Sequence, residues 1–466
     1  MYNKVTPTIT QKLEEIVGKE NVSCSKEVLA NYAKDESLEP PHFPEVVVRP
    51  DTTEEVSKIL KLASTEKIPV TPQGSRTGLS GAAHPAFGGI ALCLERMNRI
   101  LEIDEENLMA TVQPGVLVMD LHAETEKRGL LYPPDPGEES GSLGGNISTS
   151  AGGIRGLKYG VTRDYTQGLE VVLASGEVIR LGGKFIKNST GYELIDLFIG
   201  SEGTLGVVTE AIVRLVPKPT HAMVAYVPFN STREAARAVS ELIRRRAMPY
   251  MVEFLPQHAV LTIESYLKKR LPAHDHQAYL LVGVEGRSQA EVDASLETLA
   301  TILSELGAQD AYVADTPARQ QELIQARKSL FDAYKSVSEI DEVDMCIPRS
   351  HLPDYIEGCD RVMKKHGVTI VSVGHAGDGN IHSNILRGSM DGDTWHKTLN
   401  AVIEELIDLG LSLGGTVSGE HGLGSAKKDY LIKKVGIVQL ELMRSVKRAF
   451  DPLNILNPGK VPGILQ

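Results

Sequence analysis

The chain has 466 residues, of which 41% are hydrophobic and 24% charged, a composition typical of a globular protein with roughly two or three domains. Its 49 basic and 61 acidic residues give a net charge of −12, which argues against nucleic acid or an anionic membrane as the principal partner. The 4 cysteines lie far apart without a C-x-x-C pair, so neither an iron–sulfur cluster nor a disulfide framework is expected.

The start of the sequence lacks a basic segment followed by an apolar one, and no apolar run approaches the length of a bilayer span. We therefore expect a cytoplasmic protein with no membrane insertion. Because the net charge is acidic, an anionic substrate would need local positive charge at its binding site.

The first part of the chain shows an α/β pattern. Residues 53–66 carry apolar side chains at helical spacing, and residues 68–71 have the composition of a short strand. A further helix is expected near residues 117–128. Residues 169–173 and 178–181 flank an Ala-Ser-Gly-Glu turn and are predicted to form a β-hairpin.

The composition shifts at Pro217-Lys218-Pro219, where we expect a domain boundary. Beyond it, strands are predicted at residues 223–228 and 278–284, and amphipathic helices at 232–248, 291–306 and 395–413. Strands separated by helices favour a smaller α+β domain with an antiparallel sheet. The turn-rich segment 450–460 is expected to dock back onto the first domain.

A segment at residues 373–382, Val-Gly-His-Ala-Gly-Asp-Gly-Asn-Ile-His, carries two histidines around an Asp-Gly dipeptide. Asp-Gly is a strong signal for a two-residue hairpin turn, which would pair His375 directly with His382. Their Cβ atoms would then lie roughly 5 Å apart on one face of the hairpin, and Asn384 would share that face. The alternative is a polar hairpin whose histidines are only solvated.

A second motif, Gly-Glu-His-Gly at residues 419–422, offers a carboxylate and a third imidazole. Two imidazoles and a carboxylate with open positions are typical of a catalytic metal centre rather than a structural one. The candidate ligands are His375, His382 and Glu420, and His421 is the candidate general base. The residues alone also permit the reverse, with His421 as ligand and Glu420 as base.

Two glycine-rich loops, at residues 72–81 and 134–153, would let the backbone approach a large anionic cofactor. Neither is a G-x-G-x-x-G, and no G-x-x-x-x-G-K-[ST] occurs, which argues against a Rossmann NAD site and against a P-loop. Such loops can also be no more than tight turns. A third glycine-rich segment, at 200–206, weakens that alternative.

Six motifs occur along the chain: Pro-Gln-Gly-Ser-Arg-Thr-Gly at 72–78, Gly-Gly-Asn-Ile-Ser-Thr-Ser-Ala-Gly-Gly at 144–153, Gly-Ser-Glu-Gly-Thr-Leu-Gly at 200–206, His-Ala-Gly-Asp-Gly-Asn-Ile-His at 375–382, Ser-Gly-Glu-His-Gly at 418–422 and Asn-Pro-Gly-Lys at 457–460. Together they resemble the FAD-linked 2-hydroxyacid dehydrogenases of the vanillyl-alcohol oxidase superfamily, which include the glycolate oxidase D subunit, D-lactate dehydrogenases and D-2-hydroxyglutarate dehydrogenases. The resemblance covers nearly the whole chain, in the family's order.

The resemblance implies an α+β fold in which a two-subdomain FAD-binding domain of the vanillyl-alcohol oxidase type is combined with an α+β cap domain built on an antiparallel sheet. The FAD domain would span residues 1–218, the cap with the metal site 219–420, and a segment returning to the FAD domain 421–466.

The resemblance also implies which residues hold FAD, with the first loop at the pyrophosphate, residues 202–207 on the adenosine side and Asn457 near the isoalloxazine. The implied FAD-binding residues are Pro72, Gln73, Gly74, Ser75, Arg76, Thr77, Gly78, Gly81, Pro134, Asp135, Ser142, Gly145, Asn146, Ser150, Gly153, Glu202, Gly203, Val207 and Asn457. Some relatives attach flavin to a histidine of the first loop. Here the nearest imidazole, His84, lies beyond Gly81, so we expect non-covalent FAD.

The same resemblance favours Glu420 as the third ligand beside His375 and His382, and His421 as the base. A metal that accepts the hydroxyl and carboxylate oxygens of a 2-hydroxy acid would assist alkoxide formation and hold C2 for hydride transfer to flavin N5. Nitrogen and carboxylate ligands suit Zn²⁺, Fe²⁺ or Mn²⁺ alike.

Two further residues are implied at the substrate. Arg327 matches an arginine that binds the substrate carboxylate in relatives, although alone it would be interpreted as an exposed helical arginine. Asn384 would hydrogen-bond the substrate. Relatives that act on hydroxyglutarate place a lysine near the segment aligned with residues 341–344, which is acidic here. A second substrate carboxylate is therefore disfavoured, which points to lactate or glycolate.

The chain has no second redox motif, so a protein electron acceptor is expected. Similar dehydrogenases occur with electron-transfer flavoprotein subunits in complexes that bifurcate electrons to NAD and ferredoxin, and we expect that arrangement with D-lactate as substrate. The alternative is a glycolate or D-2-hydroxyglutarate dehydrogenase that uses an iron–sulfur partner or quinone. An inactive assembly subunit or an NADPH-dependent enolpyruvyl-sugar reductase would not need the histidine motifs.

Overall fold

The computed structural model describes residues 2–461, which form two compact units. Within these residues, the first unit comprises 2–151, 161–218 and 420–461, and the second comprises 152–160 and 219–419. The chain enters the second unit at Pro219, next to the Pro-Lys-Pro segment, and leaves it after Gly419. Residues 152–160 also belong to the second unit, and the amino-acid composition of this segment does not indicate it.

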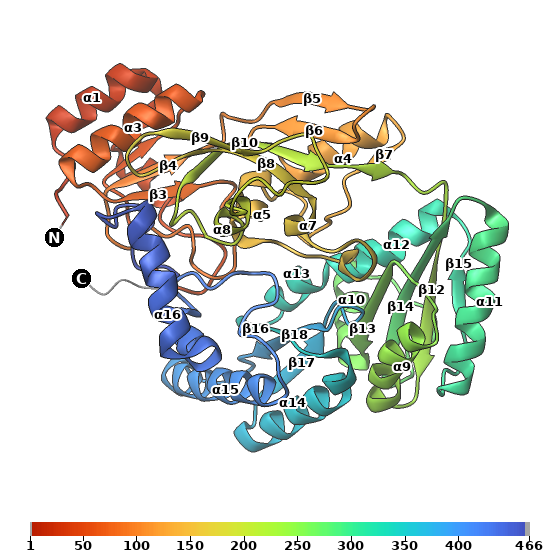
Figure 1. The fold of residues 1–466 in the computed structure, drawn as a ribbon. Coiled ribbons are helices and arrows are strands. Elements are labelled where there is room, and N and C mark those ends of the chain that lie inside the picture. The colour runs from red at the N-terminus through yellow and green to blue at the C-terminus, as the bar shows by residue number, and fades with distance from the viewer. Residues whose placement is uncertain (1, 462–466) are drawn as a thin grey trace. The chain divides into compact units, whose positions relative to one another are not determined.

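The first unit contains three sheets and several helices (Figure 1). Its elements are α1 (Pro7–Val17), η1 (Lys19–Asn21), β1 (Val22–Ser23), α2 (Lys26–Asn31), β2 (Val46–Val48), α3 (Thr53–Glu66), β3 (Val70–Gln73), β4 (Ile90–Cys93), β5 (Ile100–Asp104), β6 (Met109–Val112), α4 (Val118–Glu126), β7 (Leu130–Leu131), α5 (Leu143–Thr149), α7 (Thr162–Tyr165), β8 (Thr166–Val172), β9 (Val178–Gly182), α8 (Ile195–Phe198), β10 (Val207–Arg214), β11 (Val216–Pro217), η3 (Lys428–Tyr430) and α16 (Leu431–Phe450).

The predicted helix at 53–66 shows how the sequence builds this unit. The Thr52 side chain accepts the amide of Glu55 as an N-cap, and Val56, Ile59, Leu60 and Ala63 form one buried face. That face packs into a core shared with the parallel strands β2, β4 and β3. The second sheet, in the order β5-β6-β10-β8-β9, is antiparallel and contains the predicted β8–β9 hairpin.

The C-terminal segment returns to this core, as predicted. Val70 of β3 forms a parallel bridge with Leu456, and the amide of Asn457 donates to the carbonyl of Val70 at 2.8 Å. Ile455 and Leu456 are both fully buried. The preceding helix α16 is interrupted at Gly436, whose φ of 73° lies in the left-handed region.

The second unit has two antiparallel sheets with helices packed on them. Its elements are α6 (Gly156–Tyr159), β12 (His221–Phe229), α9 (Thr232–Arg244), β13 (Met251–Pro256), α10 (Gln257–Leu267), β14 (Ala278–Gly286), α11 (Gln289–Glu305), β15 (Tyr312–Ala314), α12 (Pro317–Lys328), α13 (Leu330–Lys335), β16 (Ile340–Cys346), η2 (Arg349–His351), α14 (Leu352–His366), β17 (Thr369–Val373), β18 (Asn380–Leu386) and α15 (Gly392–Ser412).

The larger sheet, ordered β13-β14-β12-β15, confirms the predicted antiparallel cap sheet. Its core includes the stacked rings of Tyr226 and Tyr279, 4.9 Å apart, and Ile154 from the inserted segment. Helices α9 and α11 pack against this sheet (Figure 1). The smaller sheet, ordered β16-β18-β17, has α14 against β17 and α15 against β16.

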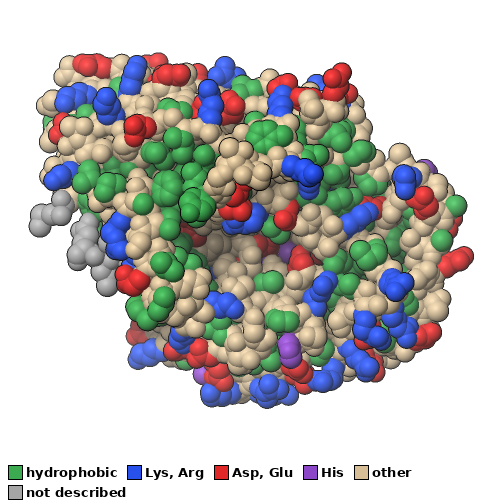
Figure 2. Space-filling view, in the orientation of Figure 1, with side chains coloured by type: hydrophobic (Ala, Val, Ile, Leu, Met, Phe, Trp, Pro, Cys, Tyr) green, Lys and Arg blue, Asp and Glu red, His purple; other side chains and the backbone are tan. Residues whose placement is uncertain are grey.

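The surface shown in Figure 2 carries lysine and arginine side chains interspersed with aspartate and glutamate. No continuous basic surface of the kind that binds nucleic acid is visible on this face. Among residues 2–461, no helix is long and apolar enough to cross a membrane.

Candidate active site

The two motif histidines lie close together, but not in the predicted register. In the structure Val373, not His375, pairs with His382, and His375 lies in the loop between β17 and β18. The hairpin prediction was therefore wrong by two residues. Because strand side chains alternate with a period of two, this shift leaves His382 and Asn384 on one face of β18. The rings of His375 and His382 still approach to 5.4 Å between centroids, in a T-shaped arrangement.

The longer loop results from hydrogen bonds to another strand. Gly374 exchanges two backbone hydrogen bonds with Phe254 of β13, at 3.0 and 3.3 Å, and the amide of Gly377 donates to the carbonyl of Val252 at 3.0 Å. These bonds hold the loop against the larger sheet. A two-residue turn would have placed these groups in the ladder of the smaller sheet instead.

Glu253, between Val252 and Phe254, reaches both His375 and Arg327. Its carboxylate is fully buried and lies 2.7 Å from Nδ1 of His375 and 2.8 Å from Nε of Arg327. Burial alone would raise the pKa of Glu253, but the neighbouring His375 ring and the Arg327 guanidinium outweigh it and lower that pKa. Sequence reasoning missed Glu253, which stands in an otherwise apolar strand.

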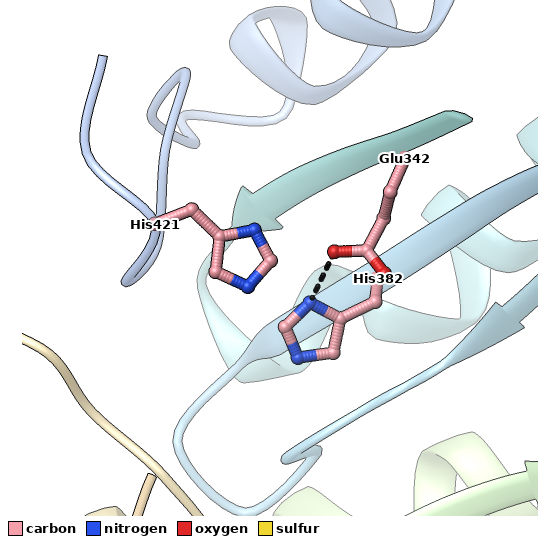
Figure 3. A group of neighbouring side chains, drawn as sticks. All are labelled: Glu342, His382 and His421. Carbon is pink, nitrogen blue, oxygen red and sulfur yellow. Dashed lines mark ion pairs between the residues drawn. The ribbon is translucent and has the colours of Figure 1, made fainter. Parts of the chain in front are cut away.

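His382 also faces a carboxylate through Nδ1. The Glu342 carboxylate lies 3.2 Å from this atom (Figure 3). The Asp344 carboxylate lies 3.8 Å from it. Both acids come from β16, where Asp344 pairs with His382 and Glu342 with Asn384. A carboxylate that accepts the Nδ1 proton of a histidine, as Glu253 does for His375, fixes the tautomer whose Nε2 can bind a metal. The contact between Glu342 and His382 is an ion pair at Nδ1. Both histidines thus lie beside a carboxylate, as metal-binding histidines commonly do.

Asp344 connects β16 to the Gly-Glu-His-Gly motif. Its fully buried carboxylate accepts hydrogen bonds from Asn380 Nδ2 at 2.6 Å, Ser418 Oγ at 3.0 Å and the Gly419 amide at 2.9 Å. A Cβ at Gly419 would lie 2.2 Å from Asn380 Nδ2, so only glycine fits there. The last residue of the second unit before Glu420 is thereby held next to His382.

Arg327 and Asn384 present polar atoms that the described chain does not satisfy. Arg327 lies near the end of α12, and its Nη2 is buried without a hydrogen-bond partner among the described residues. The same holds for Oδ1 of Asn384, whose Nδ2 donates weakly to backbone carbonyls at 3.4 Å. A buried cationic donor and a buried acceptor of this kind suit a ligand with an anionic end and a hydroxyl group.

The segment after Glu420 is anchored in the first unit. Ser80 Oγ donates to the His421 carbonyl at 3.0 Å, and the buried Glu202 carboxylate accepts the amides of Leu423 and Gly424 at 2.6 and 2.8 Å. Burial raises the pKa of Glu202 to about 7. The Glu202 carboxylate therefore holds the backbone of the segment that follows Glu420 and His421.

The glycine-rich loops of the first unit meet at Gly74 and Ser142. A Cβ at Gly74 would lie 2.0 Å from Ser142 Oγ, and the Ser75 amide donates to that hydroxyl at 3.3 Å. Ser142 also caps α5 by accepting the amide of Gly145 at 3.3 Å. Gly203 contacts the Pro72 ring, where a Cβ would lie 3.1 Å away, so residues 200–206 join the same site.

The residues of these loops fit a bound cofactor. Nδ2 of Asn146, Oε1 of Gln73 and Oδ1 of Asn457 are buried without hydrogen-bond partners among residues 2–461. Nε2 of Gln73 donates to the carbonyl of Ala83 at 2.6 Å, and Nδ2 of Asn457 donates to the carbonyl of Ala82 at 2.9 Å. Buried amide groups left half satisfied are expected where a polar ligand completes the site.

Two of the predicted FAD-binding residues are placed differently from the rest. Arg76 folds back, with its guanidinium 4.3 Å from the centroid of the Tyr32 ring. Gly153 lies in the inserted segment of the second unit. His84 is fully buried and its Nε2 lies 2.9 Å from Asp35, so its ring is packed inside the first unit.

Comparison with known proteins identifies the family. The model of the FAD linked oxidases, C-terminal domain, matches residues 218–461, and that of the FAD binding domain matches residues 44–182. The chain belongs to the FAD-linked oxidase family. This FAD-linked oxidase is 38% identical to D-lactate dehydrogenase of Anaerostipes hadrus, over 99% of its own length and 98% of the relative. It is 40% identical to glycolate oxidase subunit GlcD of Bacillus subtilis strain 168, over 98% of its own length and 97% of the relative.

The fold of this FAD-linked oxidase also occurs in a solved structure. The crystal structure of p-cresol methylhydroxylase with substrate bound matches it with a TM-score of 0.83 at 21% identity, covering 97% of this chain and 96% of that one. The predicted α+β architecture of the vanillyl-alcohol oxidase type is thereby confirmed.

Proposed function

We propose that this FAD-linked oxidase oxidises a small 2-hydroxy acid, D-lactate in the first place, to the 2-oxo acid. One arrangement carries the proposal. The rings of His375 and His382 are neighbours, and the Nδ1 atom of each lies within 3.2 Å of a carboxylate oxygen. Arg327 lies beside them, and its buried Nη2 has no hydrogen-bond partner in the described chain. A metal-ligating pair next to a buried guanidinium suits a substrate with a hydroxyl and an adjacent carboxylate.

FAD, when bound, supplies the acceptor for the hydride on C2 of the substrate. The chain's part is to hold it without a covalent bond, through the loops around Gly74, Ser142 and Gly203 and the amides of Asn146 and Asn457. The packing of His84 against Asp35 supports non-covalent binding, because that ring is fully buried.

A divalent metal, Fe²⁺, Zn²⁺ or Mn²⁺, would supply Lewis-acid polarisation of the substrate hydroxyl. His375 and His382 would hold it through Nε2, since Nδ1 of each ring faces a carboxylate. Glu420 would be the third ligand. It follows directly after Gly419, which Asp344 holds beside His382, and consecutive Cα atoms are only about 3.8 Å apart.

His421 would take the hydroxyl proton on an imidazole nitrogen. Its backbone is held by Ser80, and a neutral imidazole nitrogen can accept a proton. The reverse assignment, with His421 as ligand and Glu420 as base, predicts the opposite phenotypes. Under our assignment Glu420→Gln loses metal, whereas His421→Asn keeps the metal and loses substrate oxidation.

The substrate would have one carboxylate rather than two. Arg327 offers one buried cationic group, and Asn384 one buried amide that would hydrogen-bond the substrate. Glu342 and Asp344 place negative charge beside His382, which disfavours a second carboxylate there. D-2-Hydroxyglutarate is therefore expected to be a poor substrate.

The electron acceptor is proposed to be an electron-transfer flavoprotein, with NAD and ferredoxin reduced on the partner subunits. Two features support a protein acceptor: the chain carries no second redox motif, and no helix among residues 2–461 could span a membrane. Co-purification from the native source tests this part. Recovery of the chain with an iron–sulfur protein and without electron-transfer flavoprotein subunits would overturn it.

A second candidate substrate is glycolate, because the chain is 40% identical to a glycolate oxidase subunit. Oxidation of D-lactate, glycolate and D-2-hydroxyglutarate with an artificial electron acceptor separates the possibilities. We expect the highest kcat/KM with D-lactate and the lowest with the dicarboxylate. A higher kcat/KM with glycolate than with D-lactate would make glycolate the substrate.

A further inference from the structure

Glu253 is a fully buried carboxylate that contacts two candidate site residues at once. Oε1 lies 2.7 Å from Nδ1 of His375, and Oε2 lies 2.8 Å from Nε of Arg327. A buried carboxylate is costly unless its charge is compensated, and here both compensating groups belong to the proposed site. Its two oxygens are divided between the proposed metal side and the proposed substrate side.

The backbone fixes this arrangement. Val252 and Phe254, the neighbours of Glu253, hydrogen-bond to Gly377 and Gly374, which bracket His375 in its loop. His375 is therefore brought opposite Glu253 by bonds on both sides, independently of the side chains. The other edge of β13 pairs with β14, where Glu253 lies opposite Leu281. Strand β13 therefore cannot shift without breaking the hydrogen bonds of the larger sheet.

We infer that Glu253 is a positioning residue that aligns the metal ligand His375 and the substrate-binding Arg327 with one carboxylate. On the metal side it accepts the Nδ1 proton of His375 and directs Nε2 to the metal. On the substrate side it accepts from Nε of Arg327 and leaves Nη2 to face the substrate carboxylate. The inference rests on the proposed function, because it assumes that His375 binds a metal and Arg327 the substrate.

A shared carboxylate also couples the two sides. If Arg327 is shortened, Glu253 loses one of its two anchors and His375 is held less firmly. Metal affinity should then fall, although Arg327 is not a ligand. By thermodynamic reciprocity, metal removal should weaken substrate binding beyond the loss of direct metal contacts.

The test compares Glu253→Gln with Glu285→Gln in the FAD-loaded protein. Glu285 is the control, because it is a partly buried carboxylate of the same sheet that contacts two groups, Lys158 and Tyr159, neither of which is a proposed site residue. Zinc affinity is measured by chelator competition, and KM for D-lactate by flavin reduction. We expect Glu253→Gln to lose about 10- to 100-fold in zinc affinity and to raise KM, with FAD content unchanged. Glu285→Gln should change neither quantity.

Zinc affinity and KM within about twofold of wild type in a folded Glu253→Gln protein would overturn the inference. If that variant does not fold, Arg327→Ala decides, since it removes the second partner of Glu253, and unchanged zinc affinity in it would show that the two sides are not coupled. His382→Ala separates this inference from the proposed function. If His382→Ala loses metal and Glu253→Gln does not, the inference alone is wrong; if neither loses metal, the proposed metal site is wrong as well.

Discussion

The amide of Gly419 donates to the buried carboxylate of Asp344 at 2.9 Å, one residue before Glu420. This bond ties the end of the second unit to β16, the strand that flanks His382. The position of Glu420, the proposed third ligand, thus depends on Asp344, which does not contact the substrate in our proposal. Its importance can be tested directly.

Asp344→Asn should destabilise the second unit and reduce metal binding. Asp344 accepts three hydrogen bonds, and the amide replacement must turn an NH₂ group toward at least one donor. We expect a loss of about 1–3 kcal/mol in unfolding free energy, measured with denaturant, together with lower metal content. Ser418→Ala removes one donor only and should show a smaller change in both. Equal effects of the two variants would contradict the proposal that all three hydrogen bonds to Asp344 contribute.

His382→Ala should release the metal and slow flavin reduction by D-lactate while FAD stays bound. Loss of a Lewis acid removes several kcal/mol of stabilisation, which corresponds to on the order of 100-fold or more in rate. Metal analysis and rapid mixing measure the two effects. His366→Ala, which removes a histidine paired with Glu405 in the same unit, is the control and should change neither. Release of FAD with the metal retained would contradict the proposed roles, in which His382 binds the metal and the glycine-rich loops bind FAD.

Arg327→Lys should raise KM for D-lactate by about 10- to 100-fold with a smaller change in kcat, because lysine lacks the planar group that can contact Glu253 and the substrate together. The dependence of flavin reduction on D-lactate concentration measures both constants. Arg319→Lys is the control, because Arg319 is an exposed arginine of the same helix and pairs with Asp315. It should leave both KM and kcat unchanged. A KM unchanged in Arg327→Lys would assign the carboxylate to another residue.

Glu202 should make the stability of the first unit fall as pH rises. Burial raises its folded pKa to about 7 from the ordinary value of 4.5. Between these values the folded state keeps a proton that the unfolded state has lost, so stability decreases from about pH 4.5 to 7 and then levels off, by roughly 3 kcal/mol in all.

Denaturant unfolding of Glu202→Gln at pH 5 and pH 8 measures this effect. The variant should be less stable at pH 5, because one acceptor for Leu423 and Gly424 is lost, but its stability should depend less on pH. Glu106→Gln, at an exposed position, should keep the wild-type dependence. A Glu202→Gln protein with the wild-type pH dependence would show that another group titrates.

Local patterns predicted the elements well where one stretch of chain determines them. The helix predicted at 53–66 is α3 with the same bounds, because its apolar period and the Thr52 cap both lie in the sequence. The strand predicted at 223–228 lies within the longer β12. The helix predicted at 395–413 overlaps α15, which begins three residues earlier and ends one residue earlier. Their ends depend on packing and were less well predicted.

The features that sequence reasoning missed are set by distant contacts. The Asp378-Gly379 turn would have paired His375 with His382, but bonds from Val252 and Phe254 hold the loop open. Glu253 gave no signal because it is one acid in an apolar strand. The segment 152–160 joins the second unit through close packing, for example of Leu157 on Gly377, that no local pattern encodes.

The most direct test of the proposed function is anaerobic addition of D-lactate to the purified, FAD-loaded, metal-replete protein, followed through the absorbance of oxidised flavin. We predict that D-lactate bleaches the flavin and yields stoichiometric pyruvate, and that the metal-depleted protein reacts far more slowly. Bleaching by NADPH but not by D-lactate or glycolate would contradict the account, as would bleaching by D-lactate at the same rate with and without metal.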